Sequence, residues 1–281
     1  YVLILSGDHI YKMDYSKMLK AHIDNEADCT IAAIEVPLKE ASRFGILNTN
    51  PDGSIYEFEE KPKQPKSTLA SMGVYIFTAE KMYKYLEEDD DDPNSSKDFG
   101  KNILPAMLNA GEKMFAYRFE GYWKDVGTIS SLWEANMDLL GDKPAFDVAD
   151  SSWKIHSRNP LAPPEYCGEN AVVKNSMIAL GCEICGTVEN SVLSSNVVIE
   201  EGAVIKDSVI MSGTVVKRNA VVRYSILDED VRVGENAVIG EDKKTAKGIA
   251  VLGRNVCVGS KAKVAAGAMI DKDIKEGEEV L

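Results

Sequence analysis

A six-residue spacing of branched aliphatic residues restricts the fold of this sequence more than any other feature. The series occupies most of residues 170–272, with irregular steps at 184–192 and 222–233. Its members are Val172, Ile178, Ile184, Val192, Val198, Val204, Ile210, Val216, Val222, Val233, Ile239, Leu252, Val258, Val264 and Ile270. A period of six fits neither an amphipathic helix nor an alternating strand, but it fits a solenoid with three short faces in each coil. The repeat therefore predicts a left-handed parallel β-helix over residues 168–281.

Two details of the repeat region carry their own predictions. Residues 241–248 (EDKKTAKG) interrupt the series and predict a loop inserted between coils. Cys182 and Cys185 have the spacing of a zinc half-site, but no second cysteine pair or nearby histidine completes it. Cys182 shares the inward parity of Ile184, which favours a packed thiol.

Residues 1–140 follow a different pattern, in which apolar runs alternate with amphipathic stretches. Strands are expected at 1–5, 28–36, 72–77 and 114–119, and helices at 14–26, 79–86, 98–110 and 130–140. The turn Pro51-Asp52-Gly53 predicts a hairpin. The alternation is typical of an α/β domain with a mostly parallel, helix-covered sheet, in which residues 1–5 would be buried on both faces.

Prolines and polar residues then break both patterns over 141–167, which we interpret as a linker. The acidic run at residues 87–92 is expected to be a solvated loop, because charge blocks rarely hold a metal. The sequence thus predicts three parts, with a domain at 1–140, the linker, and the β-helix at 168–281.

Composition excludes some classes of function. The chain of 281 residues has a formal net charge of −13, which gives no electrostatic reason to bind nucleic acid or an anionic membrane. Any phosphate site must then be built locally from a few cations or backbone N–H groups. No apolar run is long enough to span a bilayer. Five sparse cysteines argue against a disulfide framework and favour a reducing cytoplasm.

Three short motifs could carry chemistry. Asp8 follows the first strand, where a carboxylate could hold Mg²⁺ or cap the next helix. Glu60 and Lys61 also follow a strand, where lysine could bind a phosphate and glutamate could accept hydrogen bonds from sugar hydroxyls, although a solvated turn is an alternative. Trp123 and Asp125 share one loop. The ring and the carboxylate could bind a sugar or a base near a metal ion; alternatively, the ring packs under the turn and Asp125 caps the next helix. The three histidines form no constellation.

Together with the hexads, several strings resemble the bacterial glucose-1-phosphate adenylyltransferase family. They are LSGDHIYKMDY, RFGIL, EFEEKP, LASMGVYIF, DFGKNILP, GYWKDVGT and HSRNP. The resemblance covers essentially the whole chain, and it implies an α/β nucleotidyltransferase domain of Rossmann-like type, with an incomplete sheet, joined to the β-helix.

The resemblance also implies residue roles. Asp8 and Asp125 match the carboxylates that hold catalytic Mg²⁺. Lys61 matches the residue at the phosphate of glucose 1-phosphate, and Glu60 the one at its sugar. The remaining matched positions are further contacts or lining residues of the sugar pocket: Gly45, Ser71, Tyr75, Asp98, Phe99 and Trp123.

The implied reaction transfers AMP from ATP to glucose 1-phosphate, giving ADP-glucose and pyrophosphate for glycogen synthesis. Positioning and charge neutralisation would supply most of the catalysis. The family begins with a Gly-rich loop that cradles the ATP phosphates, and this sequence lacks one. We therefore expect that an N-terminal portion is missing and that the chain as given is inactive or nearly so.

Three rival interpretations remain from the sequence. One is a non-catalytic regulatory paralogue, although Asp8, Lys61 and Asp125 are all present. Another is a hexapeptide-repeat acyltransferase, which needs a histidine that the repeat region lacks. The third is the same reaction on another sugar nucleotide. The resemblance further implies a homotetramer assembled through the β-helix and an allosteric sugar-phosphate site, with Arg158 as a candidate contact.

Overall fold

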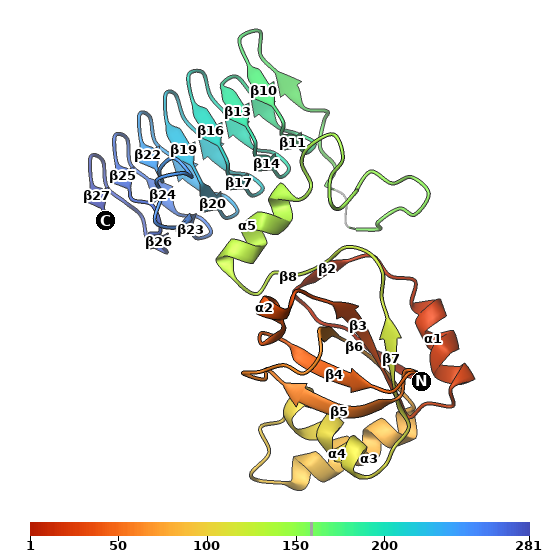
Figure 1. Ribbon diagram of the computed structural model, residues 1–281. Coiled ribbons are helices and arrows are strands. Elements are labelled where there is room, and N and C mark those ends of the chain that lie inside the picture. Colours follow the sequence, from red (N-terminus) through yellow and green to blue (C-terminus); the bar gives the residue numbers. More distant parts are fainter. Residues whose placement is uncertain (158–159) are drawn as a thin grey trace. The chain divides into compact units, whose positions relative to one another are not determined.

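The computed structural model describes residues 1–157 and 160–281 (Figure 1). The candidate effector contact Arg158 lies outside the described residues. The chain divides into two compact units, Tyr1–Trp123 and Lys124–Leu281, and each is described by itself. Within the described part of the chain, no helix is long and apolar enough to cross a membrane.

The first unit is built on one sheet with the strand order β5-β4-β6-β3-β7, to which β1 adds beside β6. The strands are β1 (Val2–Ile4), β3 (Cys29–Glu35), β4 (Gly45–Thr49), β5 (Ile55–Glu60), β6 (Leu69–Phe77) and β7 (Met114–Arg118). The prediction of a mostly parallel sheet is wrong, because among these neighbours only β3 and β7 run parallel. The hairpin β4–β5 turns at Pro51-Asp52-Gly53 as predicted, and such a short connection can only join antiparallel strands.

The first strand also differs from expectation. Residues Val2–Ile4 do form β1, but Leu3 is 39% exposed and Leu5 47%. β1 pairs with β6, but the exposed fractions of Leu3 and Leu5 show that its apolar run is not covered on both faces. An unbroken apolar run specifies a strand, whereas the number of covering elements depends on the rest of the fold.

Strand β6 shows how the sheet separates two cores. Its even-numbered residues Met72, Val74 and Ile76 pack on one face with helix α1 (Tyr15–Asp24). Tyr75 and Phe77 pack on the other face with α3 (Ala79–Asp91), the π-helix η1 (Phe99–Ile103) and α4 (Leu104–Asn109). This division follows from the two-residue period of a strand, which sends successive side chains to opposite faces.

Two helix predictions have instructive outcomes. Asp14 caps α1 as predicted, accepting a hydrogen bond from the backbone N–H of Ser16 at 3.0 Å. The acidic run predicted as a solvated loop is instead mostly helical, because α3 continues to Asp91. Glutamate is a good helix former, and Lys97 supplies positive charge to the acidic helix end by donating hydrogen bonds to main-chain carbonyls there. The first unit also contains the short α2 (Leu38–Ala41) and strand β2 (His9–Tyr11).

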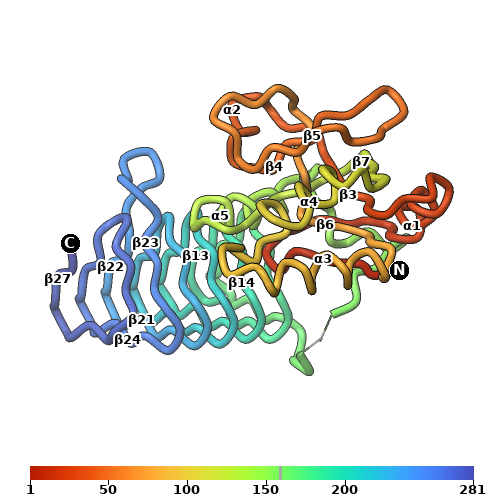
Figure 2. Tube along the Cα trace, turned by 90° about the horizontal axis from the view of Figure 1, so that it is seen from below, coloured from red at the N-terminus to blue at the C-terminus, as the bar shows by residue number. Residues whose placement is uncertain are grey.

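The second unit is a parallel β-helix, as the hexads predict, and Figure 2 shows its coils stacked along the chain. Three ladders form its faces, with orders β10-β13-β16-β19-β22-β25-β27, β11-β14-β17-β20-β23-β26 and β24-β21-β18-β15-β12-β9. The strands are β9 (Tyr166–Cys167), β10 (Val172–Lys174), β11 (Met177–Ile178), β12 (Glu183–Ile184), β13 (Thr187–Glu189), β14 (Val192–Leu193), β15 (Val198–Ile199), β16 (Val204–Lys206), β17 (Val209–Ile210), β18 (Val215–Val216), β19 (Val221–Arg223), β20 (Ser225–Leu227), β21 (Arg232–Val233), β22 (Val238–Ile239), β23 (Ala250–Leu252), β24 (Cys257–Val258), β25 (Lys263–Val264), β26 (Met269–Ile270) and β27 (Glu279–Val280).

The central coils repeat at 17 residues rather than at three full hexads. Paired residues such as Val204 and Val221 are 17 positions apart, because one corner of the coil is a residue shorter. The predicted inward series is therefore out of phase in part: Val198 and Val204 point outward, and the neighbouring Ile199 and Ile205 are fully buried. Cys182 is buried in the same core, as predicted.

A column of serines occupies the short corner. Ser191, Ser208 and Ser225 are fully buried and follow one another at 17-residue intervals. Each hydroxyl donates to the carbonyl two residues earlier, at 2.7 to 2.8 Å, and Ser191 and Ser208 each accept from the backbone N–H of the next serine. A buried corner without such partners would leave polar backbone groups unsatisfied, so the serines explain why a shortened turn is tolerated.

Helix α5 (Ile129–Met137) packs on one face of this β-helix. A capping box formed by Thr128 and Ser131 starts the helix. Trp133 is buried against Val209 and Ile226, and its indole Nε1 donates to the carbonyl of Asp207 at 2.8 Å. The inserted loop predicted at 241–248 is present, and Lys243 lies 4.3 Å from the Trp133 ring centroid.

Candidate functional site

The carboxylate of Glu60 lies where two glycines leave room for it. Glu60 ends β5 opposite Gly45 of β4, and its side chain is 23% exposed. A Cβ added to Gly45 would lie 3.0 Å from Glu60 Oε2 and 2.5 Å from Phe58 Cζ. A Cβ added to Gly100 would lie 2.7 Å from the same Glu60 oxygen. Two glycines that are far apart in sequence thus allow the backbone to approach one carboxylate closely.

Lys61 places a positive charge beside this carboxylate. Its φ of 47° is a left-handed conformation that residues other than glycine seldom adopt. Its backbone N–H donates to the carbonyl of Phe44 at 3.1 Å, which helps to hold the turn. The ammonium Nζ lies 3.7 Å from Glu60 Oε1 and is 65% exposed, so it is available to an anion from solvent.

Ser71, Tyr75 and Phe99 form the buried side of the same region. Ser71 and Tyr75 lie on β6 at positions of equal parity, and the Phe99 ring stacks on Tyr75 with centroids 5.8 Å apart. Burial raises the pKa of Tyr75 to about 12, although a hydrogen bond with Ser71 opposes that rise. Tyr75 therefore stays a neutral hydroxyl at any physiological pH. Ser71 is buried and accepts a hydrogen bond from the backbone N–H of Gly73 at 3.2 Å.

Asp98 borders the site from η1. Its carboxylate caps the π-helix by accepting from the backbone N–H of Lys101 at 3.0 Å, and its side chain is 42% exposed. A Cβ at Gly100 would lie 3.4 Å from Asp98 Oδ1 as well as close to Glu60. Gly100 therefore lies between two carboxylates that could each accept a hydrogen bond from a hydroxyl-rich ligand.

Asp8 and His9 form a second group of polar side chains in the first unit. His9 Nδ1 lies 2.8 Å from the carbonyl of Met72, and because a carbonyl only accepts, this nitrogen carries the proton. His9 Nε2 lies 3.6 Å from Asp8 Oδ1, which also accepts from the hydroxyl of Ser6 at 2.9 Å. The sequence did not single out His9, because its hydrogen-bond partner, the carbonyl of Met72, is 63 residues away in the chain.

Trp123 ends the first unit and packs between two rings. Its centroid lies 5.2 Å from that of His9 and 5.2 Å from that of Phe44, both in edge-on geometry. Its indole Nε1 is buried and has no hydrogen-bond partner among the described residues. Strand β8 (Trp123–Asp125) begins at Trp123, and Asp125, two residues later, belongs to the second unit, which starts at Lys124. Asp125 Oδ1 accepts from the backbone N–H of Gly127 at 2.7 Å.

The structure thus gathers most of the predicted residues of the first unit into one region. Gly45, Glu60 and Lys61 adjoin one another directly, and Gly100 joins Glu60 to Asp98 and Phe99. Sequence reasoning missed Gly100, Phe44 and His9. The motif DFG that contains Gly100 gave a signal, but its contact with Glu60, forty residues earlier, exists only in the fold.

Comparison with known proteins identifies relatives of both parts of the chain. The family described as nucleotidyl transferase matches residues 1–142, and the family described as GlmU-like, C-terminal hexapeptide matches residues 164–249. The chain is 62% identical over 206 residues to a glucose-1-phosphate adenylyltransferase of Clostridium perfringens, and that match covers 73% of this chain and 53% of the relative. Relatives of the same name from Clostridium botulinum and Bacillus cereus are 61% and 59% identical over 206 and 205 residues, each match covering 73% of this chain and 53% and 54% of the relative. The chain spans about half the length of the curated relatives it matches.

Proposed function

The chain belongs to the nucleotidyl transferase family, and we propose on that premise that it is part of a glucose-1-phosphate adenylyltransferase. The reaction joins ATP and glucose 1-phosphate to give ADP-glucose and pyrophosphate, a step in glycogen synthesis. Three relatives of that name, at about 60% identity, support the proposal. Their shared name favours this activity over that of an enzyme for another sugar nucleotide.

The observation that carries the proposal is the recessed carboxylate of Glu60 beside the exposed ammonium of Lys61. A sugar phosphate has hydroxyl donors at one end and a dianion at the other, and this pair offers an acceptor and a cation 3.7 Å apart. Gly45 and Gly100 let the backbone approach the Glu60 carboxylate closely, and 23% of the Glu60 side chain remains exposed for a ligand. The overall negative charge of the chain makes such a local cation necessary.

The remaining predicted contacts have complementary roles in this proposal. Asp98 would accept from a second sugar hydroxyl, and the hydroxyls of Ser71 and Tyr75 would donate to or accept from the same ligand. Phe99 would keep the Tyr75 ring in place, and Trp123 would offer an apolar wall.

In the transfer, a phosphate oxygen of glucose 1-phosphate attacks the α-phosphorus of ATP and pyrophosphate leaves. Lys61 holds the attacking phosphate and offsets its charge, and Glu60 fixes the sugar, so the chain's own contribution is orientation. A divalent ion, which we propose to be Mg²⁺, would neutralise the triphosphate. We propose the carboxylates of Asp8 and Asp125 as its ligands, and the imidazole of His9 adjoins Asp8. The two carboxylates suit Mg²⁺, which prefers oxygen, better than the imidazole does.

The test is glucose 1-phosphate binding by the chain, and ADP-glucose formation by the chain and by any longer natural form that includes it. Lys61→Met should weaken glucose 1-phosphate binding by about 10- to 100-fold, because a charge-assisted contact to phosphate is lost. Lys63→Met removes the same charge from an exposed neighbour in the same loop and should change little. Equal effects of the two substitutions, or binding that neither affects, would contradict the proposed site.

Several wider features also stand as proposals. We keep the division into a catalytic part at 1–140, a linker at 141–167 and a β-helix at 168–281. The β-helix would serve assembly into a homotetramer, or into a mixed complex with a regulatory paralogue, in the cytoplasm. Size measurement by light scattering would test the tetramer.

A further inference from the structure

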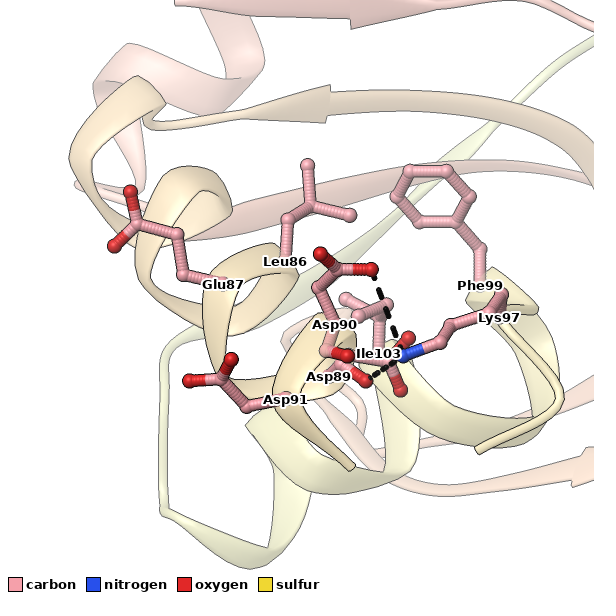
Figure 3. Close-up of a pocket in the computed structure, with 8 residues that line it drawn as sticks. All are labelled: Leu86, Glu87, Asp89, Asp90, Asp91, Lys97, Phe99 and Ile103. Carbon is pink, nitrogen blue, oxygen red and sulfur yellow. Dashed lines mark hydrogen bonds and ion pairs between the residues drawn. The ribbon is translucent and has the colours of Figure 1, made fainter. Parts of the chain in front are cut away.

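A cavity of about 650 Å³ lies between the end of α3 and η1, and Phe99 is one of the residues that line it (Figure 3). Leu86, Phe99 and Ile103 supply its apolar lining, and the acidic side chains at the end of α3 supply the rest. Lys97 also lines it, and Figure 3 shows its ammonium directed at the end of α3. No residue of this cavity has a role in the predicted site except Phe99.

The C-terminal end of α3 is electronegative, so a nearby cation would stabilise it. The last four carbonyls of a helix have no partner within the helix and carry its negative dipole end. The last turns of α3 contain five consecutive acidic residues, 87–91, and no basic one. Both the dipole and these side chains therefore make the helix end electronegative.

Lys97, which follows α3 in the chain, supplies this cation. Its Nζ donates to the carbonyls of Asp89, Asp90 and Asp92, the last two at 2.8 and 3.3 Å, and lies 3.7 Å from the Asp90 carboxylate. The backbone of Lys97 has a φ of 57°, a conformation that residues with a side chain seldom adopt, so strong contacts must hold it. Ser95 adds a second tie, since its hydroxyl donates to Asp89 Oδ1 at 2.5 Å and accepts from the Lys97 N–H at 3.0 Å.

The next three residues reach the site. Asp98 caps η1, Phe99 stacks on Tyr75, and Gly100 lies against the Glu60 carboxylate. The path of the chain from Lys97 into η1 therefore decides how closely Gly100 approaches Glu60. A shift of a few tenths of an ångström would matter, because the Gly100 backbone is already too close to Glu60 for a methyl group to fit.

We infer that Lys97 is a positioning residue for the glucose 1-phosphate site. By fastening the segment before η1 to the end of α3, it fixes Asp98, Phe99 and Gly100 around the Glu60 carboxylate. The identity of the ligand rests on the proposed function, whereas the contacts of Lys97 with α3 and of Gly100 with Glu60 lie within the first unit.

The experiment has two arms on the same variants. Amide hydrogen exchange of the peptide containing Phe99–Ile103 measures whether η1 loosens, without any substrate. Lys97→Met should speed this exchange by about tenfold, because the tie to α3 is lost. Titration with glucose 1-phosphate then measures the site, and Lys97→Met should weaken binding by about fivefold.

Two further variants control for charge and for general damage. Lys84→Met removes one charge from the same acidic helix, where Lys84 Nζ lies 3.9 Å from the Glu88 carboxylate and 5.0 Å from the Tyr85 ring centroid, and it should change neither readout. Lys97→Arg keeps a cation able to donate to several carbonyls and should restore most of the binding. If the thermal midpoint of Lys97→Met matches that of Lys84→Met, global unfolding does not explain its effect.

Each outcome decides one point. Unchanged exchange at Phe99–Ile103 in Lys97→Met overturns the inference. Faster exchange with unchanged glucose 1-phosphate affinity overturns it as well, since η1 would then not control the ligand. Failure of the unaltered chain to bind glucose 1-phosphate removes the proposed function and the positioning role with it, and the exchange arm shows separately whether Lys97 ties η1 to α3.

Discussion

In the β-helix, residues 15 to 18 positions apart, or 25 across the inserted loop, stack in register and share one kind of environment, whereas each residue of the Glu60 region has an environment that occurs once in the described chain. Val188, Ile205 and Val222 are equivalent members of one buried column. Glu60 instead depends on Gly45 from the adjacent strand and on Gly100 from η1. Repetition makes the first kind of structure easy to find from spacing, and it spreads stability over many equal contacts.

The same difference separates stability from function. Many buried residues of the β-helix are aliphatic, and its buried serines satisfy backbone groups. In the α/β unit, the polar groups that could meet a ligand lie at strand ends and in η1, beside a separate aliphatic core. Changes in the first region should therefore alter folding, and changes in the second should alter binding.

The largest effect is expected in the β-helix core. Ile205→Ala should lower the free energy of unfolding by about 2–5 kcal/mol, because a fully buried side chain leaves a cavity. Val204→Ala, one residue earlier on the outward face of β16, should cost less than about 1.5 kcal/mol. Urea unfolding with peptide-resolved hydrogen exchange would measure both. Comparable losses would mean that the inward and outward faces are not distinct.

A smaller effect is expected at Gly100, and it should concern ligand binding rather than stability. In Gly100→Ala, the new methyl group would push against Glu60 Oε2, and glucose 1-phosphate binding should weaken by about tenfold, or about 1.4 kcal/mol. The carboxylate is the flexible end of a side chain, so stability should change little. Gly7→Ala places its methyl group in open space and serves as the control. A large loss of stability without loss of affinity would place Gly100 in the core instead.

The smallest expected effect is a pH dependence confined to the first unit. His22 is fully buried between the hydroxyls of Thr30 and Thr78, and burial lowers its pKa. The unfolded state then binds a proton near pH 6.5 that the folded state resists, so stability is complete above that pH and declines below it.

The decline per histidine cannot exceed about 1.4 kcal/mol for each pH unit. Urea unfolding between pH 7.5 and 5.5 should show it in the unaltered chain and show a flatter profile in His22→Gln. Identical pH profiles would contradict the assignment to His22. Peptides of the β-helix should show no such difference between the two proteins.

Much of this molecule was accessible from sequence because its patterns are local. The six-residue spacing predicted the parallel β-helix, the Pro-Asp-Gly turn predicted the β4–β5 hairpin, and Asp14 predicted the start of α1. The predictions failed where a contact outside the element itself decided its structure. The acidic end of α3 depends on Lys97 beyond the helix, and the exposure of β1 depends on which elements cover the sheet.

The sequence by itself determined the period of the β-helix, the sites of turns and caps, and which residue types could bind a sugar phosphate, because spacing and side-chain chemistry are properties of the chain. Only the tertiary structure decided the phase of the inward residues, since one shortened corner closed by serines shifts the register. It also decided the close contact of the Glu60 carboxylate with Gly45 and Gly100, which are distant in sequence, and the way the Lys97 side chain folds back onto the end of α3, because neither contact can be read from local spacing.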